Sequence, residues 1–126
     1  MPAQALEEAV HRFGPIGLAV VWIHRVAPEA PWVVARYVGT AATPGHYFHV
    51  LGSATDDPSR PDPGRRTRFD ALPNLQYHEV ILGFMRTPRG TRWLTDEEIC
   101  QGVLRAIDSG ADRWIVGTVE PWSDHP

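Results

Sequence analysis

The sequence predicts a single α+β domain that spans residues 1–126. We expect an N-terminal helix, a mainly antiparallel sheet of about five strands in one layer, and a second helix at about 95–109 before the last strand. Three observations support this fold class. Short apolar segments of strand length alternate with turns rich in Pro and Gly. Most of these segments are joined by short turns, which favours antiparallel pairing. Only two segments show helical spacing of their apolar residues.

The composition is that of a folded protein without a general affinity for polyanions. The chain has 126 residues, 43% of them hydrophobic, with five tryptophans and a net charge of −3. This balance favours one packed core, and we expect no nucleic acid and no membrane as partner. All twelve basic residues are arginines, which excludes covalent catalysis through lysine and is typical of a GC-rich bacterial genome. The single cysteine, Cys100, and an N-terminus unlike a secretion signal predict a cytoplasmic protein without an internal disulfide.

The first two predicted elements are a helix and a strand. In residues 3–13 the apolar side chains recur at helical spacing, and Gly14 and Pro15 end the pattern. Residues 16–26 alternate as in a strand, and both faces of this strand are largely apolar. We therefore expect a central strand with Trp22 directed into the core.

Two further strands and a loop follow. Residues 32–38 are rich in β-branched and aromatic side chains and predict a second strand, and residues 46–51 predict a third. Together the three strands would form a meander. Residues 54–68 contain three prolines, one glycine and no large apolar side chain, which predicts an exposed loop.

The C-terminal half begins with a fourth strand at 77–85 and a turn at 87–90. The T-x-x-E sequence that begins at Thr95 is a capping box, so a helix should start there and end before Gly110. Residues 114–119 predict the last strand. Because the intervening helix is long enough for a crossover, this β-α-β passage leaves room for one parallel pair.

The segment GHYFHVL carries two histidines three residues apart. On a strand, neighbouring side chains alternate, so His46 and His49 should point to opposite faces and should not share one ion. A zinc site needs three or four converging ligands, and no spacing in the sequence provides them. We therefore expect no metal site and no cofactor.

A small acid–base enzyme is one of two functional hypotheses. An isomerase, cyclase or hydrolase for an apolar metabolite would place a histidine as general base in a pocket between sheet and helices. Core histidines that are hydrogen-bonded to a neighbour explain the same pattern, so the choice between enzyme and non-enzyme stays open. The candidate catalytic residues are His24, His49, His78 and Glu79.

The other hypothesis is a binding module for a small molecule or a protein partner. The sequence contains no nucleophile elbow and no phosphate-binding loop, whereas it is rich in tryptophan and arginine, which are favoured at interfaces. The same tryptophans would also suit a homodimer, and solvated loops of mixed charge are the alternative explanation for the arginines. The predicted binding residues are Trp93, Trp122, Arg65, Arg66, Arg68 and Arg89.

One stretch shows a family resemblance. The segment LTDEEICQGVLRAIDSGADRWIVGTVEPW, about a quarter of the chain, resembles the tail of some bacterial toxin-immunity proteins. The likeness consists of a helix, a Ser-Gly stop and a strand that closes near a tryptophan. It implies no functional residue.

Overall fold

The computed structural model of the chain describes residues 8, 11–12, 14, 16–22, 29–52 and 63–126. These residues form two compact units: the first contains the described residues up to His49 together with 63–77, and the second contains 50–52 and 78–126. Of the helix predicted at 3–13, the described residues Glu8, His11 and Arg12 are helical, and the others lie outside the described residues. The single domain over 1–126 stays a prediction.

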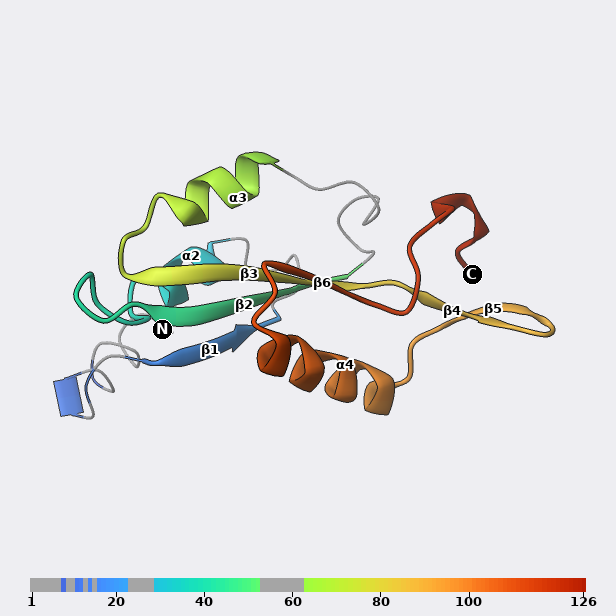
Figure 1. Ribbon diagram of the computed structural model, residues 1–126, viewed down its shortest axis with the longest axis horizontal. Helices are drawn as coiled ribbons and strands as arrows, with labels where there is room; N and C mark the ends of the chain where they lie inside the picture. Colours follow the sequence, from blue (N-terminus) through green and yellow to red (C-terminus); the bar gives the residue numbers. More distant parts are fainter. Residues whose placement is uncertain (1–7, 9–10, 13, 15, 23–28, 53–62) are drawn as a thin grey trace. The chain divides into compact units, whose positions relative to one another are not determined.

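The strands form a four-stranded sheet and a separate two-stranded sheet (Figure 1). The four strands run parallel, in the order β1 (Leu18–Val21), β2 (Gly45–Leu51), β3 (Leu75–Leu82) and β6 (Arg113–Val116). The antiparallel sheet pairs β4 (Phe84–Thr87) with β5 (Gly90–Trp93). The mixture of helices and strands is confirmed, whereas the single, mainly antiparallel sheet of about five strands is wrong.

Two unpredicted helices account for the parallel sheet. The predicted strand at 32–38 is replaced by helix α2 (Ala30–Ala35), and the predicted loop at 54–68 ends in helix α3 (Pro63–Asp70), with 53–62 outside the described residues. A helix between two strands carries the chain back to the end of the sheet at which the preceding strand began. The next strand can therefore run parallel to that strand. Prolines in the first turns of α2 and α3 fit helix starts, and tertiary context outweighs the local β preference.

Strand β1 lies at the edge of the four-stranded sheet, beside β2. Its residues Leu18 and Val20 are 49% and 45% exposed, and Trp22, just after it, is 46% exposed. The predictions of a central strand and of an inward Trp22 are therefore wrong. The side chains of β1 do alternate, but the face that carries Leu18 and Val20 is exposed in the part of the chain that the structure describes.

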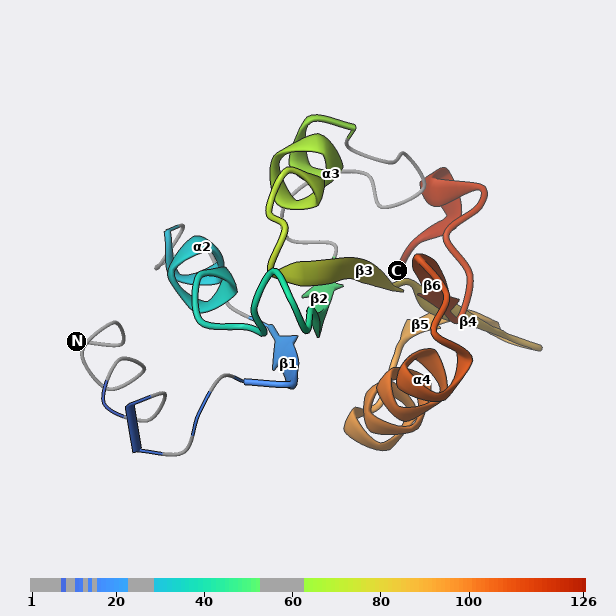
Figure 2. The same ribbon diagram turned by 60° about the vertical axis from the view of Figure 1, so that its left-hand side comes forward.

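In the first unit, α2 and α3 lie on the same face of β1 and β2 (Figures 1 and 2). Three hydrogen bonds connect segments of this unit that are distant in the sequence. The amide nitrogen of Asn74 donates to the carbonyl groups of Ala35 and Val38 at 2.9 and 2.8 Å, and the Tyr47 hydroxyl donates to the carbonyl of Pro31 at 2.9 Å. The core consists of Val21, Ala35, Val38, Tyr47, Phe69, Leu75 and Tyr77.

The second unit is built around helix α4 (Asp96–Ser109), which confirms the predicted helix. Thr95 and Glu98 form the capping box, and Gly110 ends the helix with a φ of 66°. Helix α4 packs so closely on β6 that a Cβ atom on Gly102 would lie 2.5 Å from the side chain of Val116. Strands β3 and β6 pair in parallel, which is the arrangement for which this β-α-β passage left room.

The predicted strand at 77–85 is divided by Gly83 into β3 and β4. The predicted turn at 87–90 joins β4 to β5 as a hairpin, and β5 itself was not predicted. A short 3-10 helix, η1 (Trp122–Asp124), follows β6. Within the described ranges, no helix has the length and apolar character needed to cross a membrane.

Candidate functional site

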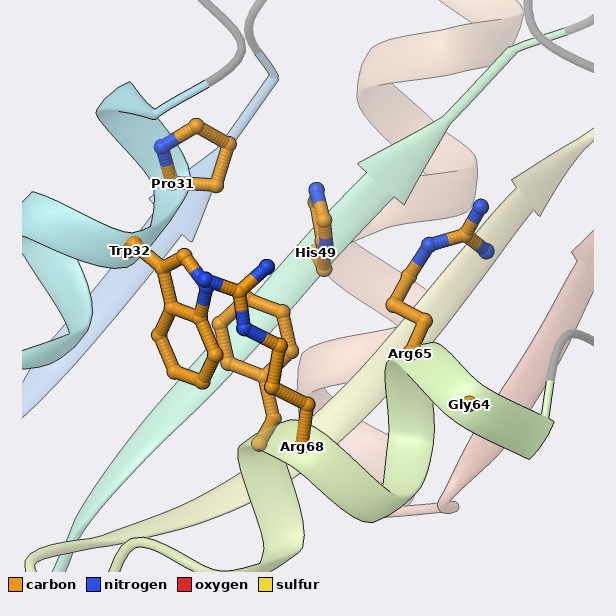
Figure 3. Close-up of a pocket in the computed structure, with 7 residues that line it drawn as sticks. Pro31, Trp32, His49, Gly64, Arg65 and Arg68 are labelled. Atoms are coloured by element: carbon orange, nitrogen blue, oxygen red, sulfur yellow. The ribbon is translucent and has the colours of Figure 1, made fainter.

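A cavity of about 410 Å³ opens in the first unit among α2, β2 and α3 (Figure 3). Pockets that bind small molecules typically measure about 300–1,000 Å³, so this volume suits a ligand with one ring or a short chain. The cavity is lined by Pro31, Trp32, His49, Gly64, Arg65, Arg68 and Phe69.

The cavity lies where parallel sheets commonly carry their sites. Pro31 and Trp32 belong to the first turn of α2, which follows β1, and Gly64 and Arg65 belong to the first turn of α3, which follows β2. A crossover helix begins near the carboxyl end of the preceding strand, and ligands of parallel α/β sheets bind outside those ends. The location of the cavity beside the first turns of two crossover helices therefore favours a ligand-binding site there.

Helix α3 directs two arginines to the cavity. Arg65 and Arg68 are three residues apart, so they share one side of the helix, and both line the cavity. Arg66 is turned elsewhere, with its guanidinium carbon 5.2 Å from the centre of the Tyr77 ring and a 4.0 Å ion pair to Asp70. No carboxylate occurs among the described residues that line the cavity. The charged residues in this described part of the lining are thus Arg65 and Arg68.

Trp32 forms the base on which Arg68 rests. The guanidinium carbon of Arg68 lies 3.9 Å from the centre of the Trp32 rings, and the ring of Phe69 stacks on Trp32 at 4.5 Å. A guanidinium over the face of an indole is attracted by the ring and can still donate N–H groups to an anion. The Nε1 atom of Trp32 is buried and has no hydrogen-bond partner among the described residues, which costs about 1–3 kcal/mol for a buried donor.

His49 is the titratable group of the cavity. Its side chain is 7% exposed, and its Nδ1 atom lies 2.9 Å from the hydroxyl oxygen of Tyr77. Burial, together with the nearby charge of Arg65, lowers the pKa of His49 to about 4. The ring is therefore neutral at pH 7, with its Nδ1 atom within hydrogen-bond distance of the Tyr77 hydroxyl group. In Figure 3 the ring is seen between the side chains of Arg65 and Arg68.

The prediction that His46 and His49 point to opposite faces is confirmed, since the ring of His46 lies near that of Phe48 and the ring of His49 lies near that of Tyr47. Of the other predicted acid–base residues, His24 lies outside the described residues. Among the residues that the structure describes, no group of three His, Cys, Asp or Glu side chains could hold a metal ion.

His78 and Glu79 belong to the second unit and do not line this cavity. They are 4% and 2% exposed, and the Nδ1 atom of His78 donates to the carbonyl of Ala111 at 2.9 Å. This bond to the backbone is what a histidine with a packing role would make. The cavity therefore brings together only His49 from the predicted acid–base set.

The predicted binding residues divide between the units. Arg65 and Arg68 line the cavity of the first unit, whereas Trp93, Trp122 and Arg89 lie in the second. Trp93 is 44% exposed, and its ring centre is 6.2 Å from that of Trp122. Trp122 in turn stacks on His125 at 4.6 Å. Trp93 is thus exposed as expected, while Trp122 is partly covered.

A second cavity, of about 340 Å³, lies in the second unit between α4 and β6. Its charged lining residues are Glu98 and Arg105. Hydrogen bonds from Arg92, at 2.7 and 3.1 Å, together with the capping contact to Thr95, lower the pKa of Glu98 to about 2. The Glu98 carboxylate already accepts hydrogen bonds from Arg92 and from the backbone of Thr95 at the start of α4. It is therefore less available for a hydrogen bond to a ligand than the arginines of the first cavity.

Sequence reasoning missed Trp32 and Phe69 as cavity residues. A signal for the cavity itself was Pro63 followed by Arg65 and Arg68, since a proline at a helix start would have placed the two arginines on one side of a helix.

Comparison with protein-family models, with curated protein sequences and with solved structures found no match. The chemistry of the cavity is therefore the guide to its function.

Proposed function

We propose that the protein is a binding module for a small anionic molecule, which it holds in the cavity among α2, β2 and α3. The observation that carries this proposal is that the Arg68 guanidinium lies 3.9 Å from the centre of the Trp32 rings in a cavity that Arg65 also lines. An anion in the cavity would accept charge-assisted hydrogen bonds, which are about twice as strong as neutral ones.

The neighbours of the arginines suit this role. The indole of Trp32 lies under the guanidinium of Arg68 at 3.9 Å, so this side chain is held near its binding position before a ligand arrives. Side chains that are already ordered lose less entropy on binding. Trp32, Phe69 and Pro31 supply apolar surface for the uncharged part of the ligand.

A ligand screen by chemical unfolding tests the proposal. The panel contains phosphate esters, carboxylates and sulfonates, each with a neutral counterpart. A ligand at about a hundred times its Kd stabilises a protein by about 2.7 kcal/mol. We expect at least one anion, and not its neutral counterpart, to stabilise the wild type.

The variants assign such an effect to the cavity. Stabilisation should disappear in the double variant Arg65→Gln, Arg68→Gln. It should persist in Arg66→Gln, which removes a charge from the same helix outside the cavity. A double variant that responds like the wild type, or a panel without any stabilising anion, would contradict the proposal.

An acid–base enzyme is the second candidate, and the position of His49 in this cavity is the observation in its favour. A pKa of about 4 makes the imidazole a weak base at neutral pH, which favours binding over catalysis. A bound anion would raise that pKa. If a stabilising anion exchanges carbon-bound hydrogen with deuterated solvent in the wild type and not in His49→Gln, the enzyme is supported. Binding without exchange contradicts it.

A protein partner or a second copy at the exposed Trp93 is a further proposal, supported by the 44% exposure of this side chain. Sedimentation of the wild type and of Trp93→Ser would test self-association. A concentration-dependent dimer that Trp93→Ser abolishes supports a second copy as the partner, and a wild type that stays monomeric at all concentrations contradicts the second copy.

A further inference from the structure

We infer that His49 is a binding residue of the cavity, and that its imidazole ring takes up a proton when an anion binds beside it. The inference rests on the proposed function and adds the regulation of the same site, because the affinity for the anion should rise as the pH falls. The coupling needs only an anion close to the imidazole, wherever else that anion is held.

His49 lies where an occupant of the cavity comes close to it. The cavity measures about 410 Å³, and His49 is the residue that β2 contributes to its lining. Figure 3 shows the imidazole beside the side chains that α3 presents. A ligand pocket encloses most of its ligand, and charges in such a space interact more strongly than in bulk water. A negative charge in this cavity therefore acts directly on the ring.

Without an anion, the surroundings of His49 disfavour its charged form. The ring packs among the aromatic rings of Tyr47, Phe69 and Tyr77, with centres 5.8, 5.5 and 5.9 Å away. Burial and then the positive charge of Arg65 lower the pKa of His49 to about 4. The imidazole is thus held in place at the cavity but carries no charge at neutral pH.

The charged groups that the described elements bring to His49 are positive. The charged and titratable groups are Arg65 and Arg68 of α3, Tyr47 of β2 and Tyr77 of β3. The register neighbour on β1 is Val21, and the cavity residues of α2 are Pro31 and Trp32, none of which titrates. A bound anion would therefore supply a negative charge of the kind that stabilises an imidazolium.

The contact with Tyr77 allows the ring to gain a proton without moving. The Nδ1 atom of His49 lies 2.9 Å from the hydroxyl oxygen of Tyr77. A neutral ring can accept the hydroxyl proton at Nδ1, and a charged ring donates from Nδ1 to the same oxygen, since a hydroxyl group both donates and accepts. Both states of the imidazole therefore keep this hydrogen bond.

The coupling of proton and anion follows from linkage. An opposite charge within about 4–6 Å raises the pKa of a histidine by about one to three pH units. If the anion strengthens the binding of the proton, the proton strengthens the binding of the anion by the same factor. Well above both pKa values the affinity is constant. As the pH falls toward the value of about 4 in the free protein, the complex holds a proton that the free protein lacks.

Isothermal titration of the full chain with benzenesulfonate at pH 5 and pH 7.5 tests the inference. A sulfonate keeps its single charge over this range, so the probe itself does not titrate, and its ring suits the apolar surface of Pro31, Trp32 and Phe69. If the anion raises the pKa of His49 by about two units, the Kd should be about tenfold lower at pH 5. Two buffers with different ionisation enthalpies should then report the uptake of most of one proton at pH 5.

Two variants assign the proton to His49. His49→Gln keeps a polar side chain that does not titrate, so its Kd should differ by less than about twofold between the two pH values. His46→Gln removes a histidine of the same strand that points to the opposite face, and it should keep the tenfold difference. Circular dichroism verifies that each variant folds. In the wild type, NMR titration of the His49 ring should show a higher pKa with benzenesulfonate than without it.

The outcomes distinguish this inference from the proposed function. If benzenesulfonate binds the wild type with the same Kd at both pH values, or leaves the titration of the His49 ring unchanged, the proton coupling is wrong and the anion-binding function stands. A His49→Gln variant with the pH dependence of the wild type would also overturn the coupling. If benzenesulfonate binds at neither pH, the inference is wrong, and the wider anion panel decides the proposed function.

Discussion

The Nδ1 atom of His49 lies 2.9 Å from the hydroxyl oxygen of Tyr77, and both side chains are buried. This contact joins β2 to β3 beside the cavity and fixes the orientation of the imidazole. A buried nitrogen that loses its partner costs about 1–3 kcal/mol. Tyr77→Phe should therefore lower the free energy of unfolding by that amount, as measured with urea, although the ring keeps its stacking on Phe69.

Tyr47→Phe is the matched comparison for this change. It removes the hydrogen bond to the carbonyl of Pro31 but leaves the partner of His49 in place. Only Tyr77→Phe should alter the ¹⁵N signals of the His49 ring. Equal signals in both variants, or a stability loss below about 0.5 kcal/mol for Tyr77→Phe, would argue against a structural role of the contact.

The lowered pKa of His49 predicts a pH dependence of stability. In the unfolded chain the imidazole titrates near its ordinary value of 6.5, and in the folded chain it titrates near 4. Between these values the unfolded state binds more protons, so stability is complete above pH 6.5 and falls as the pH approaches 4. The loss amounts to up to about 3 kcal/mol.

Urea unfolding of the wild type and of His49→Gln between pH 4 and 7.5 measures this contribution. The difference in stability between the two proteins should shift in favour of the variant as the pH falls. Parallel pH profiles would show that the folded state does not disfavour the charged imidazole.

Arg92 should control the titration of Glu98 at the start of α4. Hydrogen bonds from Arg92 are the largest cause of the low pKa of this carboxyl. Arg92→Gln should raise the pKa from about 2 toward 4.5 but not fully, because the backbone N–H of Thr95 still donates to the carboxylate at 2.9 Å. Side-chain carboxyl NMR follows the titration. Arg89→Gln, on the same hairpin, should change nothing, and an equal shift in both variants would refute the specific contact.

Gly102 marks the closest approach of α4 to β6. A Cβ atom there would lie 2.5 Å and 2.6 Å from the two methyl carbons of Val116. Gly102→Ala should therefore destabilise the protein, since overpacking costs about 1–3 kcal/mol and exceeds the gain in helix propensity of about 1 kcal/mol. In a Val116→Ala background the added methyl group has room, and the same change should become neutral or favourable. Additive effects in this double-mutant cycle would contradict the packing.

Elements with a complete local signal were predictable from the sequence. Helix α4 has its capping box at Thr95 and its left-handed glycine at Gly110, and both act within a few residues. Strand β2 follows from its alternation, which also placed His46 and His49 on opposite faces. In each case the local preference and the tertiary packing agree.

The parallel sheet was not predictable from local preference, because α2 contains Trp32, Val33 and Val34, which favour strands in isolation. Helix α3 is short and polar, with Phe69 as its buried residue. Both helices are stabilised by packing on the first unit's core, which sequence periodicity does not report. His49, Arg65 and Arg68 were each candidate residues, but their common cavity depends on these two helices.

The central claim is that an anion binds at Arg65 and Arg68 in the cavity of the first unit. Two-dimensional ¹H–¹⁵N NMR of the indole and arginine side-chain groups, recorded while phenyl phosphate is added, tests it most directly. The account predicts that the signals of Trp32, Arg65 and Arg68 move together and saturate, while those of Trp93 and Trp122 stay in place. Movement of Trp93 and Trp122 with an unchanged Trp32 would contradict it.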